Sequence, residues 1–204
     1  MMYGGAGIDG LELRTARDGS RRLSGSFPYG KRAVLSDGGK NGRPRKEQFA
    51  PKAFAYRVNK SDEDIHILVG HDYDRPLASR GAGTLDLKDT EDALIFEAVI
   101  KPEMGEVSYV RDFFAAFSAG LIGGISPGFR IPPEQTVPNA ERVDEENPRE
   151  GRALIRTVFA ALLYEISMVT VPAYKETQVE ARSWTPDLIL PDSGLHRTLN
   201  RWRA

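Results

Sequence analysis

The chain has 204 residues, of which 40% are hydrophobic and 28% charged, and its net charge is −1. These values suit one globular domain with some loop or tail, and the near-neutral charge gives no field that would favour nucleic acid or an anionic membrane. The lack of cysteine excludes disulfides, thiolate metal sites and a cysteine nucleophile. No apolar run approaches the roughly 18 residues that span a bilayer, and the N-terminus lacks a signal-peptide pattern, so the expected location is the cytoplasm of the producing cell.

The first part of the chain is predicted to open with a hairpin. Residues 11–30 predict a hairpin: the stretch 11–15 alternates between apolar and polar side chains, an Asp-Gly turn follows, and residues 21–30 continue as a second strand. Residues 36–48 are rich in glycine and basic side chains, a composition that predicts a mobile loop. Residues 51–58 then fit a short helix with a proline near its start.

Three more strands are expected between residues 64 and 100. Residues 64–70 alternate, with Ile65 and Ile67 on one face and His66 on the other. His71 follows where this strand should end. Residues 83–100 predict two strands joined by a polar turn.

The second half contains the clearest helix. Residues 105–121 carry apolar side chains three or four positions apart, and Gly120 is a suitable C-cap. Residues 132–152 are rich in proline and charge, which predicts a long surface excursion without a core of its own. Residues 153–171 are mostly apolar and predict one or two buried strands.

This order of elements predicts the fold class. The strands do not alternate regularly with helices, which argues against a doubly wound sheet. We therefore expect an α+β, β-rich fold, namely a closed or nearly closed β-barrel flanked by helices. One domain is expected over residues 1–183, including the loops at 36–48 and 132–152, and a C-terminal tail at 184–204.

Only three histidines are available for chemistry that needs an imidazole. His71 at the end of a buried strand is held firmly while its ring faces the rim, which suits a general base, although an edge histidine without a chemical role fits the same position. His66 faces the other way on the same strand and is interpreted as structural. His196 lies in the tail and is given no role.

Ser126 lies in the stretch Gly-Gly-Ile-Ser-Pro-Gly-Phe. A serine is a poor nucleophile unless a base takes its proton and donors hold the oxyanion. Gly123, Gly124 and Gly128 have no side chains, so backbone N–H groups here could approach a substrate closely. The pattern is not the GxSxG elbow of α/β-hydrolases, and taken alone it also fits a structural turn.

Glu165 is a carboxylate inside an otherwise apolar strand. A buried unpaired charge is costly, so Glu165 must reach a rim or find a partner. That partner is either a histidine or an arginine such as Arg130 or Arg156. Ser167 lies two residues on, and therefore on the same face of a strand.

A metal-dependent hydrolase is the alternative from another enzyme class. His66, His71, Asp72 and Asp74 are residue types that bind zinc and similar ions. The odd spacing of the two histidines places them on opposite faces of a regular strand, which disfavours a shared ion.

Several stretches together resemble the prohead maturation proteases of tailed bacteriophages, a family whose fold is related to the herpesvirus assemblin proteases. The resemblance covers about residues 11–182, in family order. Its stretches are LSGSFPYG (23–30), EQFAPKAF (47–54), ILVGHDYDRPLASRGAGTL (67–85), SAGLIGGISPGF (118–129) and LYEISMVTVPAYKETQV (163–179).

The resemblance implies a serine endopeptidase that needs no metal or organic cofactor. His71 matches the histidine of the family's His-Asp motif, and Ser126 matches the nucleophile before a Gly-Phe pair. Glu165 matches the acidic residue of the Glu-Ile-Ser motif and is the expected third member of a triad. Backbone N–H groups around Gly124, Gly128 or Arg130 are expected to form the oxyanion hole or contact the substrate.

The resemblance also implies substrates and a setting. The substrates would be the major capsid protein with its scaffolding region and the protease itself, cut inside the assembling procapsid in the host cytoplasm. Self-cleavage could remove the tail at 184–204, and a homodimer is an open expectation; no nucleic acid or membrane partner is expected. The alternative is a catalytically inactive scaffold or capsid-assembly factor on the same fold.

Overall fold

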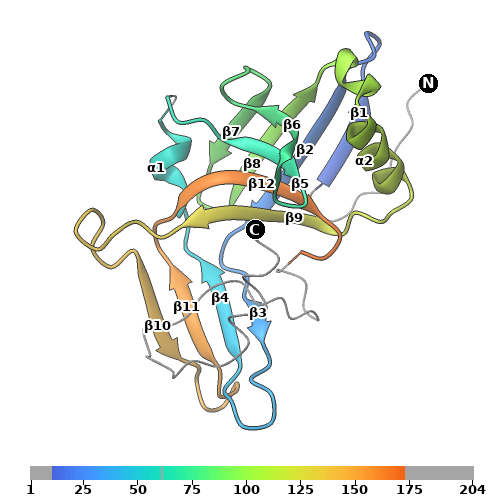
Figure 1. Cartoon of the computed structure of the whole chain (residues 1–204). Coiled ribbons are helices and arrows are strands. Elements are labelled where there is room, and N and C mark those ends of the chain that lie inside the picture. The colour runs from blue at the N-terminus through green and yellow to red at the C-terminus, as the bar shows by residue number, and fades with distance from the viewer. Residues whose placement is uncertain (1–10, 61, 173–204) are drawn as a thin grey trace.

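The computed structural model describes residues 11–60 and 62–172, which are mostly β-strand. Twelve strands in this part of the chain form three four-stranded sheets, and two short α-helices and one 3-10 helix accompany them (Figure 1). The predicted tail at 184–204 and His196 lie outside the described residues.

The first sheet is antiparallel throughout, in the order β1-β2-β8-β7. Its strands are β1 (Leu11–Thr15), β2 (Arg21–Pro28), β7 (Leu85–Asp89) and β8 (Ala93–Ile100). The hairpin predicted over residues 11–30 is therefore confirmed, with its second strand ending at Pro28, and so are the two strands within 83–100. Gly19 supplies the left-handed residue of the first turn, with φ of 86°.

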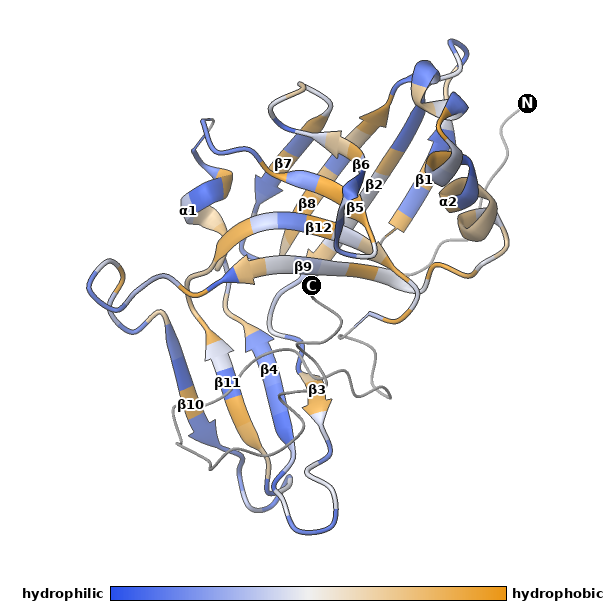
Figure 2. Cartoon of the chain, viewed as in Figure 1, coloured by the Kyte–Doolittle hydropathy of each residue, from blue (hydrophilic) through white to orange (hydrophobic). Residues whose placement is uncertain are grey.

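The second sheet has the order β10-β11-β4-β3, with β11 and β4 parallel. Its strands are β3 (Ala33–Ser36), β4 (Arg45–Phe49), β10 (Glu141–Glu145) and β11 (Leu154–Val158). The sheet extends away from the other two, and β4 and β10 are largely hydrophilic (Figures 1 and 2).

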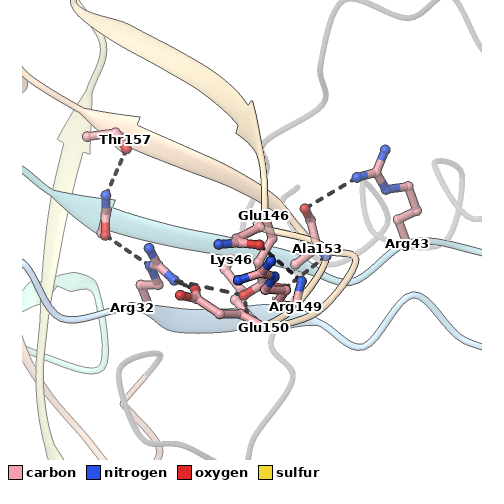
Figure 3. A network of polar contacts seen from close by, with 10 residues as sticks. Arg32, Arg43, Lys46, Glu146, Arg149, Glu150, Ala153 and Thr157 are labelled. Atoms are coloured by element: carbon pink, nitrogen blue, oxygen red, sulfur yellow. Dashed lines mark hydrogen bonds and ion pairs between the residues drawn. The ribbon is translucent and has the colours of Figure 1, made fainter.

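Two predicted loops are thus partly wrong, because each contains a strand of this second sheet. The segment 36–48 ends in β4, and the segment 132–152 contains β10. The charged side chains of these segments show no alternation with apolar ones, so the residues contain no strand pattern. Their backbones nevertheless form the hydrogen bonds of a sheet, because strand preference depends strongly on context. Ion pairs accompany the pairing: Glu146, just after β10, binds Lys46 of β4 and accepts the N–H of Ala153, as Figure 3 shows.

The third sheet has the order β6-β5-β12-β9, with β5 and β12 parallel at its centre. Its strands are β5 (His66–Val69), β6 (Asp72–Ser79), β9 (Gly124–Arg130) and β12 (Leu162–Val169). The strand expected near residues 64–70 is confirmed. Of the one or two strands expected within residues 153–171, the structure contains two, β11 and β12.

The helices are short. They are α1 (Ala55–Val58), η1 (Pro102–Glu106) and α2 (Ser108–Ser118). The C-cap of α2 is Ala119, one residue before the predicted Gly120. Gly120 follows it with a left-handed φ of 71°, and the N–H of Leu121 returns to the carbonyl of Ala116. Among the described helices, none is long and apolar enough to cross a membrane.

One hydrophobic core lies between the first and third sheets and is closed by the helices. Leu94 and Phe96 from β8 share it with Ile67 from β5 and Ile166 from β12. Helix α2 adds buried aromatic side chains, including Phe113. The core therefore fixes the inner face of the third sheet and leaves the outer face for chemistry.

The predicted fold class is wrong: none of the three described sheets closes into a barrel. A barrel needs an unbroken ladder of hydrogen bonds from the first strand to the last. Here the ladder stops between β6 and β7, where the chain turns at residues 80–84 and β7 pairs with β8 of another sheet. The alternation of a strand is the same in a barrel and in packed sheets, so the sequence pattern did not distinguish them.

Candidate active site

The three predicted site residues come together on the third sheet from three separate segments. Ser126 lies on β9, Glu165 lies on β12, and His71 lies in the turn between β5 and β6. The Nε2 atom of His71 is 3.1 Å from Ser126 Oγ, and its Nδ1 atom is 2.7 Å from Glu165 Oε1. Both distances allow hydrogen bonds.

The partners of the His71 ring define its neutral tautomer. An ionised carboxylate only accepts hydrogen bonds, so Nδ1 carries the proton and donates it to Glu165. This leaves a lone pair on Nε2, which accepts the hydroxyl proton of Ser126. An imidazole held this way between a carboxylate and a hydroxyl can take the hydroxyl proton as the oxygen attacks.

The position of His71 depends on a two-residue turn with left-handed backbone. Gly70 and His71 have φ of 66° and 63°, and Val69 pairs with Asp72 across the turn. Two consecutive residues with positive φ are typical of the tight turns that join hairpin strands. Histidine is one of the residue types that tolerate this region better than most, yet the conformation remains uncommon outside glycine.

A β-bulge on β12 turns Glu165 toward the site. Leu163 is fully buried in the core, and in a regular strand Glu165, two residues later, would face the core as well. The register against β9 shifts by one residue between Leu163 and Glu165, so that Tyr164 is the extra residue. Glu165 and Ser167 therefore face Ser126, while Ile166 and Met168 face the core.

The buried carboxylate of Glu165 is satisfied on both oxygens. Its side chain is 5% exposed; Oε1 bonds His71, and Oε2 accepts the hydroxyl of Ser167 at 2.6 Å. The Ser167 oxygen in turn accepts the backbone N–H of His71 at 2.8 Å. Two hydrogen bonds from the protein offset the cost of burying this charge.

Exposure differs among the three residues. Ser126 is only 2% exposed, whereas the side chain of His71 is 45% exposed. Tyr73, on β6, is influenced by the charge of the site. Partial burial raises the pKa of its hydroxyl, and the negative charge of Glu165 raises that pKa further. The site is thus closed by the protein around Ser126 and open to solvent at the imidazole.

The glycines around Ser126 make room for the protein itself. A Cβ on Gly123 would lie 2.1 Å from the carbonyl oxygen of Thr170, and one on Gly124 would lie 3.1 Å from the Pro172 ring. A Cβ on Gly128 would lie 1.8 Å from Glu165 Oε1. Sequence reasoning interpreted these glycines as clearance for a substrate, because close packing by a distant strand leaves no local signal.

The structure does not contain the alternative arrangement, in which Glu165 pairs with Arg130 or Arg156. Arg156 bonds Glu47 and Glu141 of the second sheet. Arg130 lies at the exposed end of β9, with its guanidinium 5.4 Å from the centroid of the Tyr164 ring. Neither arginine forms an ion pair with Glu165 among the described residues.

The residues named for a metal site do not converge. The described residues contain no group of three or more His, Cys, Asp or Glu side chains placed to hold an ion. His66 instead packs its ring edge-on against Tyr73, with 5.8 Å between ring centroids, and lies 3.7 Å from Asp64. Its position agrees with the structural interpretation.

Comparison with known proteins identifies the family to which this site belongs. No curated protein and no solved structure matches the chain closely enough to be compared with it. The family model for the caudovirus prohead serine protease matches residues 36–188, which is well over half of the chain and includes His71, Ser126 and Glu165. The chain therefore belongs to the caudovirus prohead serine protease family.

Proposed function

We propose that this prohead serine protease uses Ser126 as its nucleophile, His71 as general base and Glu165 as the residue that orients the imidazole. The observation that carries the proposal is the continuous chain of hydrogen bonds from Ser126 Oγ through both His71 nitrogens to Glu165 Oε1. Serine needs such a base, because its hydroxyl is a weak nucleophile at neutral pH.

The reaction then follows acyl transfer in two stages. The proton of Ser126 moves to His71 Nε2 as Oγ bonds to the peptide carbonyl carbon, and Glu165 stabilises the resulting imidazolium. That proton passes to the leaving amine when the C–N bond breaks, which leaves an acyl-enzyme. Water then gives a proton to Nε2 as its oxygen bonds to the ester carbon. When the C–Oγ bond breaks, that proton passes from Nε2 to Ser126 Oγ, and the carboxylic acid product leaves.

The oxyanion would be held by backbone N–H groups beside Ser126. Gly124 and Gly128 remain the proposed donors, because both lie on β9 two residues from the nucleophile. Arg130 fits this role less well, since it lies at the end of β9, four residues from Ser126. The carbonyl would approach from the side on which the His71 ring is exposed.

The proposed substrates are the capsid and scaffold proteins of the procapsid, and the protease itself. The family description supports action in the prohead. Cleavage inside the procapsid in the host cytoplasm, removal of the 184–204 segment and formation of a homodimer are further parts of this proposal. Each is open to direct measurement once the active serine is known.

Labelling with a fluorophosphonate probe tests the nucleophile. The full chain should react covalently at Ser126, as peptide mapping by mass spectrometry will show, and Ser126→Ala should not react. Ser20→Ala is a matched control, because Ser20 is also buried and hydrogen-bonded but lies in the β1–β2 turn. Labelling of Ser126→Ala at the wild-type rate would disprove the assignment.

Co-expression with the major capsid protein of the same phage tests the substrate. The wild type should yield processed shells, and Ser126→Ala should yield shells with full-length capsid protein. Shells that assemble with unprocessed capsid protein in the presence of the wild-type chain would favour the inactive assembly factor instead.

A further inference from the structure

Ser167 lies at the centre of the site, and its hydroxyl bonds the other two site residues and not the nucleophile. It is fully buried, and it pairs with Ser126 across the β12–β9 ladder. Its hydroxyl proton goes to Glu165 Oε2 at 2.6 Å, and its oxygen accepts the N–H of His71 at 2.8 Å. One hydroxyl thus joins the carboxylate to the backbone of the residue whose ring that carboxylate orients.

At Glu165, the Ser167 hydroxyl is the hydrogen-bond donor to Oε2 among the described residues. Among the described residues, no other donor reaches Glu165 Oε2, and the side chain is 5% exposed. A buried carboxylate oxygen that loses its donor is left unsatisfied, and the carboxylate then moves or changes its interactions. Either outcome alters the angle at which Oε1 meets the His71 ring.

The His71 end holds a strained turn. His71 has φ of 63°, a conformation that persists only where the surroundings fix it. Two hydrogen bonds attach the turn to β12: the N–H of Gly70 to the carbonyl of Met168, and the N–H of His71 to Ser167. Without the hydroxyl, only the first of these bonds remains.

We propose that Ser167 is a positioning residue, which sets the orientation of Glu165 and the height of the His71 ring above Ser126 at the same time. This inference rests on the proposed function, because its effect is read at Ser126. Ser167 takes no part in bond making or proton transfer. Its loss lowers the reactivity of Ser126 through the geometry of the other two residues.

The test compares Ser167→Ala, Ser167→Thr and Ser20→Ala in the full chain. The measured quantity is the second-order rate of fluorophosphonate labelling at Ser126. We expect Ser167→Ala to react about 10- to 100-fold more slowly, the usual effect of unsatisfying a buried charged hydrogen bond. Ser167→Thr keeps the hydroxyl and should recover most of the rate.

Ser20→Ala separates positioning from a general loss of stability. It removes a 2.6 Å hydrogen bond from a buried serine hydroxyl to the exposed carboxylate of Asp18, in the β1–β2 turn of another sheet. It should label at the wild-type rate. A nitrogen-edited proton NMR signal from His71 Nδ1–H should shift in Ser167→Ala and stay unchanged in Ser20→Ala.

Two results would overturn the inference. One is a folded Ser167→Ala that labels at the wild-type rate with an unshifted His71 signal. The other is a folded Ser167→Thr that reacts as slowly as the alanine variant. A wild-type chain that does not label at Ser126 would instead contradict the proposed function, and the His71 signal would still report on Ser167.

Discussion

Gly128 shows how tightly the site is built at the level of single residues. It lies opposite Glu165 across the β9–β12 ladder, and a Cβ at this position would fall 1.8 Å from Glu165 Oε1. An alanine side chain at this position would fit only if the Glu165 carboxylate moved away from His71. We therefore expect Gly128→Ala to lower fluorophosphonate labelling of Ser126 by about 100-fold or more, because a misoriented imidazole is a poor base.

A glycine elsewhere provides the comparison for this variant. Gly105 has open space where a Cβ would be placed, so Gly105→Ala should label like the wild type. If Gly128→Ala labels as fast as Gly105→Ala, Glu165 must have a second position from which it can still orient the His71 ring.

At the scale of an element, the second sheet contains ion pairs as well as apolar contacts. The hydrogen bond from Lys46, followed by the N–H of Ala153, lowers the pKa of Glu146 below its usual value. A carboxyl group whose pKa is lower in the folded state stabilises that state above its unfolded pKa of about 4.3. This contribution is lost as the pH falls through the lower, folded pKa.

We therefore expect wild-type thermal stability to fall more steeply below about pH 4 than that of Glu146→Gln, which has no proton to gain. The measurement is the midpoint of thermal unfolding by circular dichroism between pH 3 and pH 7. Glu103→Gln is the control: Glu103 is exposed, has no ion pair among the described residues, and should keep the wild-type acid dependence. Equal slopes for all three proteins would exclude Glu146 as the origin.

At the scale of the whole molecule, the shared core keeps the site sheet in place. Phe96 on β8 is 1% exposed and belongs to the same core as Ile166 and Met168, which lie behind Glu165 and Ser167. Phe96→Ala should lower the free energy of unfolding by about 3–5 kcal/mol, from lost burial and the cavity that remains. Urea unfolding followed by circular dichroism measures this change.

The neighbouring residue on β8 is a matched control for the core. Ile95 faces the opposite side of the strand and is 41% exposed, so Ile95→Ala should cost less than about 1 kcal/mol. Similar losses for both variants would mean that the core does not lie on this face of β8.

The residues of the candidate site could be named from the sequence because their types are scarce and because they match the family pattern. Three histidines, no cysteine and one carboxylate in an apolar strand left few ways to build a hydrolase. The strand that precedes His71 and the strand that contains Glu165 followed from their patterns. The strands β4 and β10 were missed because charged side chains conceal a strand whose backbone pairs normally. The closed barrel was wrongly predicted because the alternation of apolar and polar side chains indicates a half-buried strand but does not show which strands pair with it.

The sequence by itself determined which residues could carry the chemistry, and the family pattern that contains them. Only the tertiary structure decided how they meet. The one-residue bulge at Tyr164 turns Glu165 away from the core, the left-handed turn at Gly70–His71 lifts the ring over β9, and Ser167 links the two. These features depend on the register and backbone angles of strands far apart in the chain, so no local pattern of residues specifies them.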